Sequence, residues 1–192
     1  MSSATQLRDH PAGYGVVSRA FHWIMAAFIV WQLVTVLTRI LANDTALANF
    51  FWGTHFSVGF TIFVLAILRG AWGLSNLSNR PSHEGPAPLR AAATIGHFAM
   101  YALMIVVPFL AILRAANNGR GFSVYGVQLV APGGEPNPAL TAPASALHGL
   151  LGFVLFILIA GHIAFALWHG LARRDGTLDR MTKGRSARPF GA

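Results

Sequence analysis

The chain has 192 residues, of which 54% are hydrophobic and only 10% charged, and its mean hydropathy is +0.54. Soluble domains carry about a quarter charged residues, so this composition is typical of a membrane protein. The 14 Lys and Arg outnumber the 6 Asp and Glu, but they flank apolar blocks, which argues against a nucleic-acid partner. The chain has no cysteine, which excludes disulfides, iron–sulfur clusters, thiolate zinc sites and covalent c-type haem.

Four apolar stretches predict an all-α protein, an integral membrane four-helix bundle. They cover residues 18–38, 51–72, 94–113 and 147–170. Each is long enough for the roughly 20 helical residues that cross a bilayer. No internal repeat is visible, so residues 1–192 are expected to form one domain. Its basic tail, about 172–192, is expected to be disordered beyond the first turn. The run FSVYGVQLV before the last stretch favours a short interfacial strand or hairpin.

The distribution of basic residues predicts the orientation in the membrane. One side of the predicted bundle carries only Arg39, Arg114 and Arg120, which leaves eleven of the 14 Lys and Arg for the side of the two termini. Because cytoplasmic segments carry the excess of Lys and Arg, both termini are expected in the cytoplasm.

Histidines are concentrated in the apolar stretches. Six of the eight lie within them or at their ends: His22, His55, His97, His148, His162 and His169. An ionisable group at membrane depth is a functional hypothesis by default. A lone histidine could equally make an interhelical hydrogen bond, but six in four helices make that explanation hard to sustain for all of them.

Depth divides four of these histidines into two layers. Counted from the helix midpoints, His55 and His148 lie roughly 10 Å and 15 Å toward the outer face, and His22 and His162 lie roughly 9 Å and 6 Å toward the cytoplasm. His148 and His162 are 14 residues apart, so one helix offers a ligand to each layer on nearly the same face. Two stacked haems, each held by two histidines, need this arrangement.

Space for a flat porphyrin separates these four histidines from the other two. The residues four positions after them are small: Ala26, Gly59, Gly152 and Ala166. His97 and His169 are followed at that position by Tyr101 and Arg173. Small residues are also common wherever membrane helices pack closely, but four small residues after these four histidines and none after the other two favour room for a porphyrin ring.

Several motifs resemble those of the bacterial cytochrome b561 family, four-helix dihaem membrane proteins that include a type oxidising superoxide and reducing ubiquinone. They are YGVVSRAFHW, FWGTHFSVGF, IGHFAMY, LHGLLGFVLFILIAGHIAFALWH and RDGTLDRM. The resemblance covers residues 14 to about 181 and implies two b-type haems. It implies that His22 and His162 are axial ligands to the iron of the inner haem, and His55 and His148 to that of the outer haem. His169 matches a family histidine near the inner haem, and His97 matches a third-helix position without an assigned role.

The leading functional hypothesis is a membrane electron-transfer oxidoreductase. A one-electron donor reduces the outer haem, the electron passes to the inner haem, and membrane ubiquinone accepts it. The resemblance implies superoxide as the donor, which makes the protein a superoxide oxidase (superoxide:ubiquinone oxidoreductase). Arg39, Arg114 and Arg120 are candidates for steering this anion, although solvated loop arginines are the simpler reading. His169 is a candidate proton carrier for the quinone, and an interfacial histidine is its plain alternative.

Two other functions use the same histidines. The first is the haem-bearing membrane subunit of a larger quinone-linked dehydrogenase or hydrogenase complex, against which the lack of a fifth apolar stretch argues. The second, of another class, is a metal-binding transporter. That function predicts carboxylates at membrane depth, and the four stretches contain no Asp or Glu.

Overall fold

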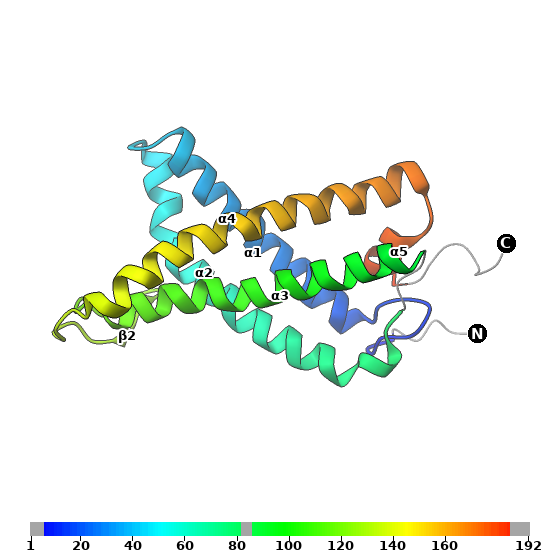
Figure 1. The fold of residues 1–192 in the computed structure, drawn as a ribbon, viewed down its shortest axis with the longest axis horizontal. Helices are drawn as coiled ribbons and strands as arrows, with labels where there is room; N and C mark the ends of the chain where they lie inside the picture. Colours follow the sequence, from blue (N-terminus) through cyan, green and yellow to red (C-terminus); the bar gives the residue numbers. More distant parts are fainter. Residues whose placement is uncertain (1–5, 82–85, 185–192) are drawn as a thin grey trace. The chain divides into compact units, whose positions relative to one another are not determined.

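Four long helices make up most of the part of the chain that the structure describes (Figure 1). The computed structural model describes residues 6–81 and 86–184. The helices are α1 (Val16–Leu41), α2 (Ala46–Ser75), α3 (Ala87–Ala116) and α4 (Pro138–Trp168). All four are long and apolar enough to cross a membrane. The predicted all-α membrane four-helix fold is therefore confirmed.

Each helix is longer than the apolar stretch that predicted it. The helices contain 26 to 31 residues, which corresponds to about 39 to 47 Å, whereas the hydrocarbon core is about 30 Å thick. Hydropathy predicts only the part of a helix that can lie in the hydrocarbon core. The helix itself continues into flanking residues that are good helix formers. The alanine-rich start of α3 illustrates this, as does Pro138 in the first position of α4, where a proline needs no hydrogen-bond donor.

A short antiparallel hairpin follows α3, which confirms the predicted hairpin. Strands β1 (Phe122–Val124) and β2 (Val127–Val130) pair through a two-residue turn. Tyr125 and Gly126 have φ of 47° and 83°, the left-handed values of a type I′ turn. The turn is attached to α2, because the Tyr125 N–H donates to Ser57 Oγ at 3.0 Å and the Tyr125 hydroxyl lies 3.0 Å from Thr61 Oγ1.

The tail after α4 is ordered, and the expectation of disorder beyond its first turn is wrong as far as residue 184. It forms the π-helical turn η2 (His169–Arg173) and the helix α5 (Thr177–Thr182). Two contacts with α1 hold it: Trp23 Nε1–H donates to the Met181 carbonyl at 3.1 Å, and Arg19 Nη1 to the Thr182 carbonyl at 2.9 Å. Residues 185–192 lie outside the described part of the chain.

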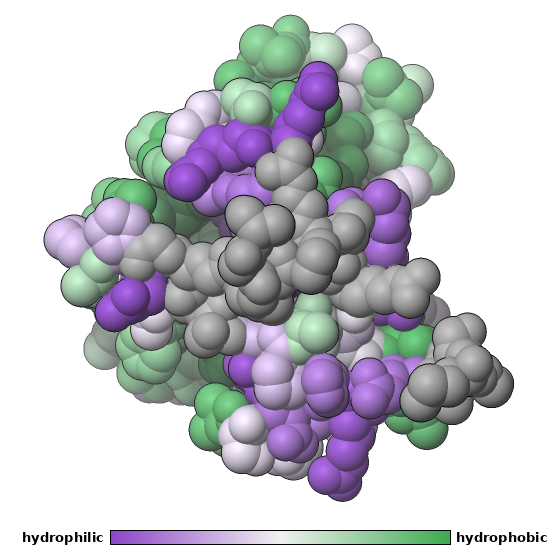
Figure 2. Space-filling view, turned by 90° about the vertical axis from the view of Figure 1, so that its right-hand side faces the viewer, coloured by the Kyte–Doolittle hydropathy of each residue, from purple (hydrophilic) through white to green (hydrophobic). Residues whose placement is uncertain are grey.

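The chain divides into two compact units. The described residues of the first are 6–24, 68–100 and 157–184, and those of the second are 25–67 and 101–156. Each unit thus receives one segment of every long helix, together with its own group of histidines. The first also contains η1 (Leu77–Asn79), the N-terminal segment and α5. Figure 2 shows hydrophilic side chains gathered on the face that it presents, with hydrophobic ones around them.

Candidate functional site: two histidine pairs

The second unit brings together the histidines of the predicted outer layer. The rings of His55 on α2 and His148 on α4 lie close together in an edge-on arrangement, with centroids 6.1 Å apart and planes inclined by 79°. His148 Nδ1 lies 2.8 Å from the Val107 carbonyl of α3. Because a carbonyl oxygen only accepts, Nδ1 carries the hydrogen and the lone pair of Nε2 stays available. His55 Nδ1 is buried without a hydrogen-bond partner.

Two side chains beside His55 stack on one another. Trp52 lies against the imidazole at 4.8 Å between centroids, with the planes only 20° apart. The Arg39 guanidinium lies over the Trp52 ring at 5.3 Å, and Arg39 Nη1 is 3.5 Å from Asn49 Oδ1. The structure therefore connects one predicted steering residue, Arg39, to the outer pair through an aromatic ring.

The glycines expected to make room for a porphyrin differ in their surroundings. A Cβ added at Gly152, one turn after His148, would meet only Val107 Cγ1 at 3.9 Å, an ordinary contact. At Gly59, one turn after His55, it would meet Gln32 Nε2 at 3.3 Å. Gln32 also donates to the His55 carbonyl at 3.0 Å and so joins α1 to α2 at this level.

The first unit brings together the histidines of the predicted inner layer. His22 on α1 and His162 on α4 have ring centroids 6.3 Å apart and planes inclined by 65°. Arg69 Nη2 lies 3.3 Å from His22 Nδ1. A guanidinium only donates, so Nδ1 accepts here and the neutral ring carries its hydrogen on Nε2. To bind a metal through Nε2, the neutral ring must carry its hydrogen on Nδ1, so Arg69 must first break its contact with Nδ1.

His97 of α3 also lies close to the inner pair. Its ring centroid is 5.4 Å from that of His162, with planes inclined by 81°. Its Nδ1 is 2.6 Å from the Ala93 carbonyl, four residues earlier in the same helix. His97 is therefore oriented by its own helix and adjoins His162 from a third helix.

The spacing of the two pairs fits a metal ion between their rings. An imidazole nitrogen binds a metal at about 2.0 Å and lies ~1.1 Å from its ring centroid, so two rings that would hold one iron between them would have centroids about 6.2 Å apart. The observed 6.1 Å and 6.3 Å agree with this separation, whereas the 5.4 Å between His97 and His162 is too short for it.

The number of ligands favours haem over a bare metal ion. Within residues 6–81 and 86–184, no group of three or more His, Cys, Asp or Glu could hold a metal ion. Structural zinc needs four protein ligands and catalytic zinc three. A haem brings four nitrogen ligands of its own and needs only two from the protein, so paired histidines fit a haem.

His169 lies at the end of α4, where it contacts a carboxylate. Its Nδ1 is 2.6 Å from Asp175 Oδ2, and the other carboxylate oxygen accepts the Thr177 N–H at 3.1 Å. Arg173 Nε lies 3.5 Å from the same Oδ2. Burial alone would raise the pKa of Asp175, but the hydrogen bonds from His169 and Thr177 outweigh it and lower the pKa from the ordinary 3.8.

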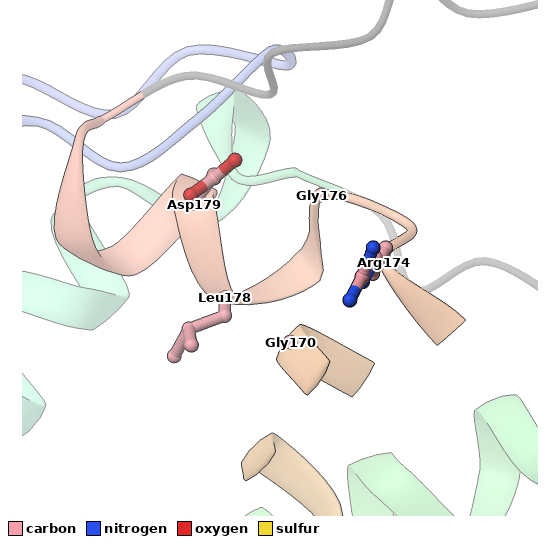
Figure 3. A pocket seen from close by; sticks show the side chains of 5 residues that line it. All are labelled: Gly170, Arg174, Gly176, Leu178 and Asp179. Carbon is pink, nitrogen blue, oxygen red and sulfur yellow. The ribbon is translucent and has the colours of Figure 1, made fainter. Parts of the chain in front are cut away.

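A small crevice lies between η2 and α5 (Figure 3). It has a volume of about 130 Å³ and is lined by Gly170, Arg174, Gly176, Leu178 and Asp179. Ligand pockets usually measure about 300 to 1,000 Å³, so this crevice is too small for a quinone head group.

The remaining steering candidates are exposed side chains of the second unit. Arg114 lies in the last turn of α3, and Arg120 lies two residues before β1. The residues that sequence reasoning missed at the site are Trp52, Gln32, Arg69 and Asp175. Trp52 had a signal, since residues three apart are neighbours on a helix. The contacts of Gln32 and Arg69 join residues 23 and 47 positions apart, for which one sequence holds no signal.

Four membrane helices with facing histidines have the architecture of a membrane haem protein, and the comparison with known families gives the same class. The family model described as prokaryotic cytochrome b561 matches residues 13–184. The chain belongs to this family of membrane electron-transfer proteins.

Three relatives match along most of their length. The chain is 28% identical over 182 residues to cytochrome b561 homolog 2 of Escherichia coli K12. The matched region covers 94% of this chain and 96% of the relative. It is 30% identical over 163 residues to cytochrome b561 homolog 1 of the same strain, which covers 83% and 91%. It is 27% identical over 170 residues to a Yersinia pestis protein named probable superoxide oxidase CybB, which covers 88% and 94%.

Proposed function

We propose that the chain is a superoxide:ubiquinone oxidoreductase of the bacterial inner membrane that binds two b-type haems. The overall reaction is 2 O₂•⁻ + ubiquinone + 2 H⁺ → 2 O₂ + ubiquinol, in which two superoxide ions each lose one electron. His55 and His148 would hold the outer haem, and His22 and His162 the inner one. A haem in each place supplies reversible one-electron chemistry of iron.

The observation that carries this proposal is the presence of one histidine pair in each compact unit, with ring centroids 6.1 Å and 6.3 Å apart. A single pair would support a cytochrome with one haem. Two pairs support transfer of electrons across the membrane, because their histidines on α4, His148 and His162, are 14 residues apart in the sequence of that helix.

Two features support superoxide as the donor. The similarity to the protein named probable superoxide oxidase extends over 88% of this chain. Arg39, Arg114 and Arg120 belong to the same unit as His55 and His148, and the Arg39 guanidinium lies over Trp52, which itself stacks on His55. A positive surface attracts an anionic substrate and increases its rate of encounter. With both termini in the cytoplasm, this surface faces outward.

The quinone would react on the cytoplasmic side, where His169 is the candidate proton carrier. Ubiquinone takes up two protons with its two electrons, and a histidine can transfer protons near neutral pH. His169 follows His162 by seven residues, or about 10 Å along a helix, toward the C-terminus, which supports a role between the inner pair and the cytoplasm.

The test is stepwise reduction of the oxidised, haem-loaded protein under anaerobic conditions. Superoxide is added first and the haem absorption recorded, and ubiquinone is added second. Reduction in the first step that superoxide dismutase suppresses, followed by reoxidation in the second, is the expected result. Reduction that the dismutase does not suppress would exclude superoxide as the donor, and a protein that stays reduced after ubiquinone would exclude this acceptor.

A further inference from the structure

We propose that Asp175 is a positioning residue for proton delivery to the quinone, acting through His169. The proposal rests on the proposed function, because it concerns the cytoplasmic half of that reaction. The Asp175 carboxylate fixes which nitrogen of His169 keeps its hydrogen and which nitrogen exchanges a proton with the substrate.

The contact between the two side chains is short and has one direction. His169 Nδ1 lies 2.6 Å from Asp175 Oδ2, which is the distance of a charge-assisted hydrogen bond. An ionised carboxylate only accepts, so Nδ1 donates and keeps its hydrogen. Nε2 is then the ring nitrogen that can give up and regain a proton.

Three neighbouring groups contact the Asp175 carboxylate: His169, Thr177 and Arg173. The Thr177 N–H donates to Asp175 Oδ1 at 3.1 Å, which leaves Oδ2 for His169. Arg173 Nε, 3.5 Å from Oδ2, adds a positive charge. The lowered pKa of Asp175 agrees with these contacts and keeps the carboxylate ionised at neutral pH.

The backbone between the two residues is unusual in a way that produces their contact. After the π-helical turn η2, Arg174 has φ of 50° and Gly176 has φ of 82°. These left-handed conformations reverse the chain, so that Asp175, six residues after His169, returns to the imidazole. Single π-helical turns are rare and often occur at functional sites, and a non-glycine residue in the left-handed region is uncommon.

The proton balance follows from this arrangement. Protonated His169 donates the Nε2 hydrogen to an oxygen of the quinone as the quinone takes up electrons. The resulting neutral imidazole keeps the Nδ1 hydrogen, which still donates to the Asp175 carboxylate. It then takes a new proton at Nε2 from cytoplasmic water. A second cycle supplies the second proton of the quinol. Without the carboxylate, the neutral ring would occupy both tautomers and lose its fixed orientation.

The experiment compares Asp175→Asn with Asp175→Glu and with the matched control Asp179→Asn in the haem-loaded protein. Asp179 belongs to α5 and pairs with Lys183 at 3.0 Å, so its substitution perturbs the same tail without removing the contact to His169. Two quantities are measured. One is the rate at which ubiquinone reoxidises the reduced protein. The other is the ¹⁵N chemical shift of each His169 ring nitrogen in the reduced protein, assigned by its loss in His169→Gln.

We expect Asp175→Asn to slow reoxidation by about tenfold to a hundredfold, with reduction by the donor unchanged. Its ¹⁵N shifts should change from a single Nδ1–H tautomer to a mixture. Asp175→Glu should restore most of the rate, and Asp179→Asn should match the wild type. A wild-type rate and tautomer in Asp175→Asn, or equal loss in Asp179→Asn, would overturn the proposal. Failure of the wild type itself to reduce ubiquinone would instead overturn the proposed function, and this proposal with it.

Discussion

The indole ring of Trp52 lies almost parallel to the imidazole ring of His55, with centroids 4.8 Å apart and planes inclined by 20°. The two histidines of the outer pair are thus oriented by different means. A hydrogen bond to the Val107 carbonyl fixes His148, whereas His55 has no partner for its buried Nδ1 and is fixed by stacking. The Arg39 guanidinium also lies over the Trp52 ring, 5.3 Å from its centroid.

We therefore predict that Trp52→Leu changes the outer haem alone. Stacked aromatic pairs contribute about 0.5 to 1.5 kcal/mol beyond the area they bury, so haem retention at this site should weaken by roughly twofold to tenfold. The low-spin ferric signal of the outer haem in the electron paramagnetic resonance spectrum should shift, because that signal depends on the orientation of the axial rings. Trp52→Phe, which keeps a ring to stack, is the control. An unchanged spectrum in Trp52→Leu would show that stacking does not orient His55.

The second prediction concerns the number and attachment of the haems. Two histidine pairs and the absence of cysteine predict two non-covalent b-type haems per chain. Acid–acetone extraction should remove all of the haem, and the pyridine haemochrome assay should give two per chain. One haem per chain, or haem that remains with the protein, would contradict the assignment.

The third prediction separates the ligands from their neighbours. His55→Ala or His148→Ala should remove the outer haem and leave the inner one, and His22→Ala or His162→Ala should do the reverse, because the partners of each pair lie in the same unit. His97→Ala is the informative comparison, since this ring lies 5.4 Å from His162. The assignment fails if His97→Ala loses a haem while His162→Ala retains both.

The sequence was sufficient to predict the helices and which histidines lie at equal depth in them. It was not sufficient to predict contacts that depend on a reversal of the chain. Apolar runs predicted four helices because membrane helices must be both long and apolar. Counting residues along those helices grouped His55 with His148 and His22 with His162, because depth in a straight helix is proportional to residue number.

The contact of Asp175 with His169 had no such signal. The basic tail gave the impression of a disordered segment, whereas its order depends on local backbone geometry at Arg174 and Gly176. It also depends on contacts such as that of Trp23 with the Met181 carbonyl, 158 residues away in the sequence. Neither the φ angles nor that pairing follows from composition, charge or periodicity.

The fourth prediction concerns alkaline pH at the N-terminal segment. Burial raises the pKa of Tyr14 above its ordinary 10.0, with Arg80 opposing the shift. In the unfolded segment the phenol ionises first, so the contribution of Tyr14 to stability is complete below about pH 10 and is lost as the pH rises through the folded pKa. The segment joins the tail through the Tyr14 N–H, which donates to the Arg180 carbonyl at 3.3 Å.

Limited proteolysis of the N-terminal segment should accelerate above this pH in the wild type. Tyr14→Phe, which cannot ionise, should remain resistant to a higher pH in the same assay. Equal pH dependence in the two proteins would exclude Tyr14 as the titrating group.

The last prediction joins the orientation in the membrane to the chemistry. If both termini are cytoplasmic, the His55 and His148 pair faces the outside, where superoxide is retained because an anion crosses the bilayer poorly. Arg114 and Arg120 are exposed residues of the same unit as this pair, so replacing both with Gln should lower the second-order rate with superoxide. It should also flatten the dependence of that rate on ionic strength, because steering by exposed charges is screened within about 8 Å at physiological salt.

The matched control removes two positive charges from the other unit, with Arg90→Gln and Lys183→Gln. Haem content should be unchanged in both double variants, and only the outer one should lose rate and salt dependence. An unaltered rate and salt slope in the outer variant would exclude Arg114 and Arg120 from the reaction, and equal loss in both would show an effect of net charge alone. A wild-type rate no faster than spontaneous dismutation would exclude superoxide itself and leave a cytochrome that delivers electrons to quinone from another donor.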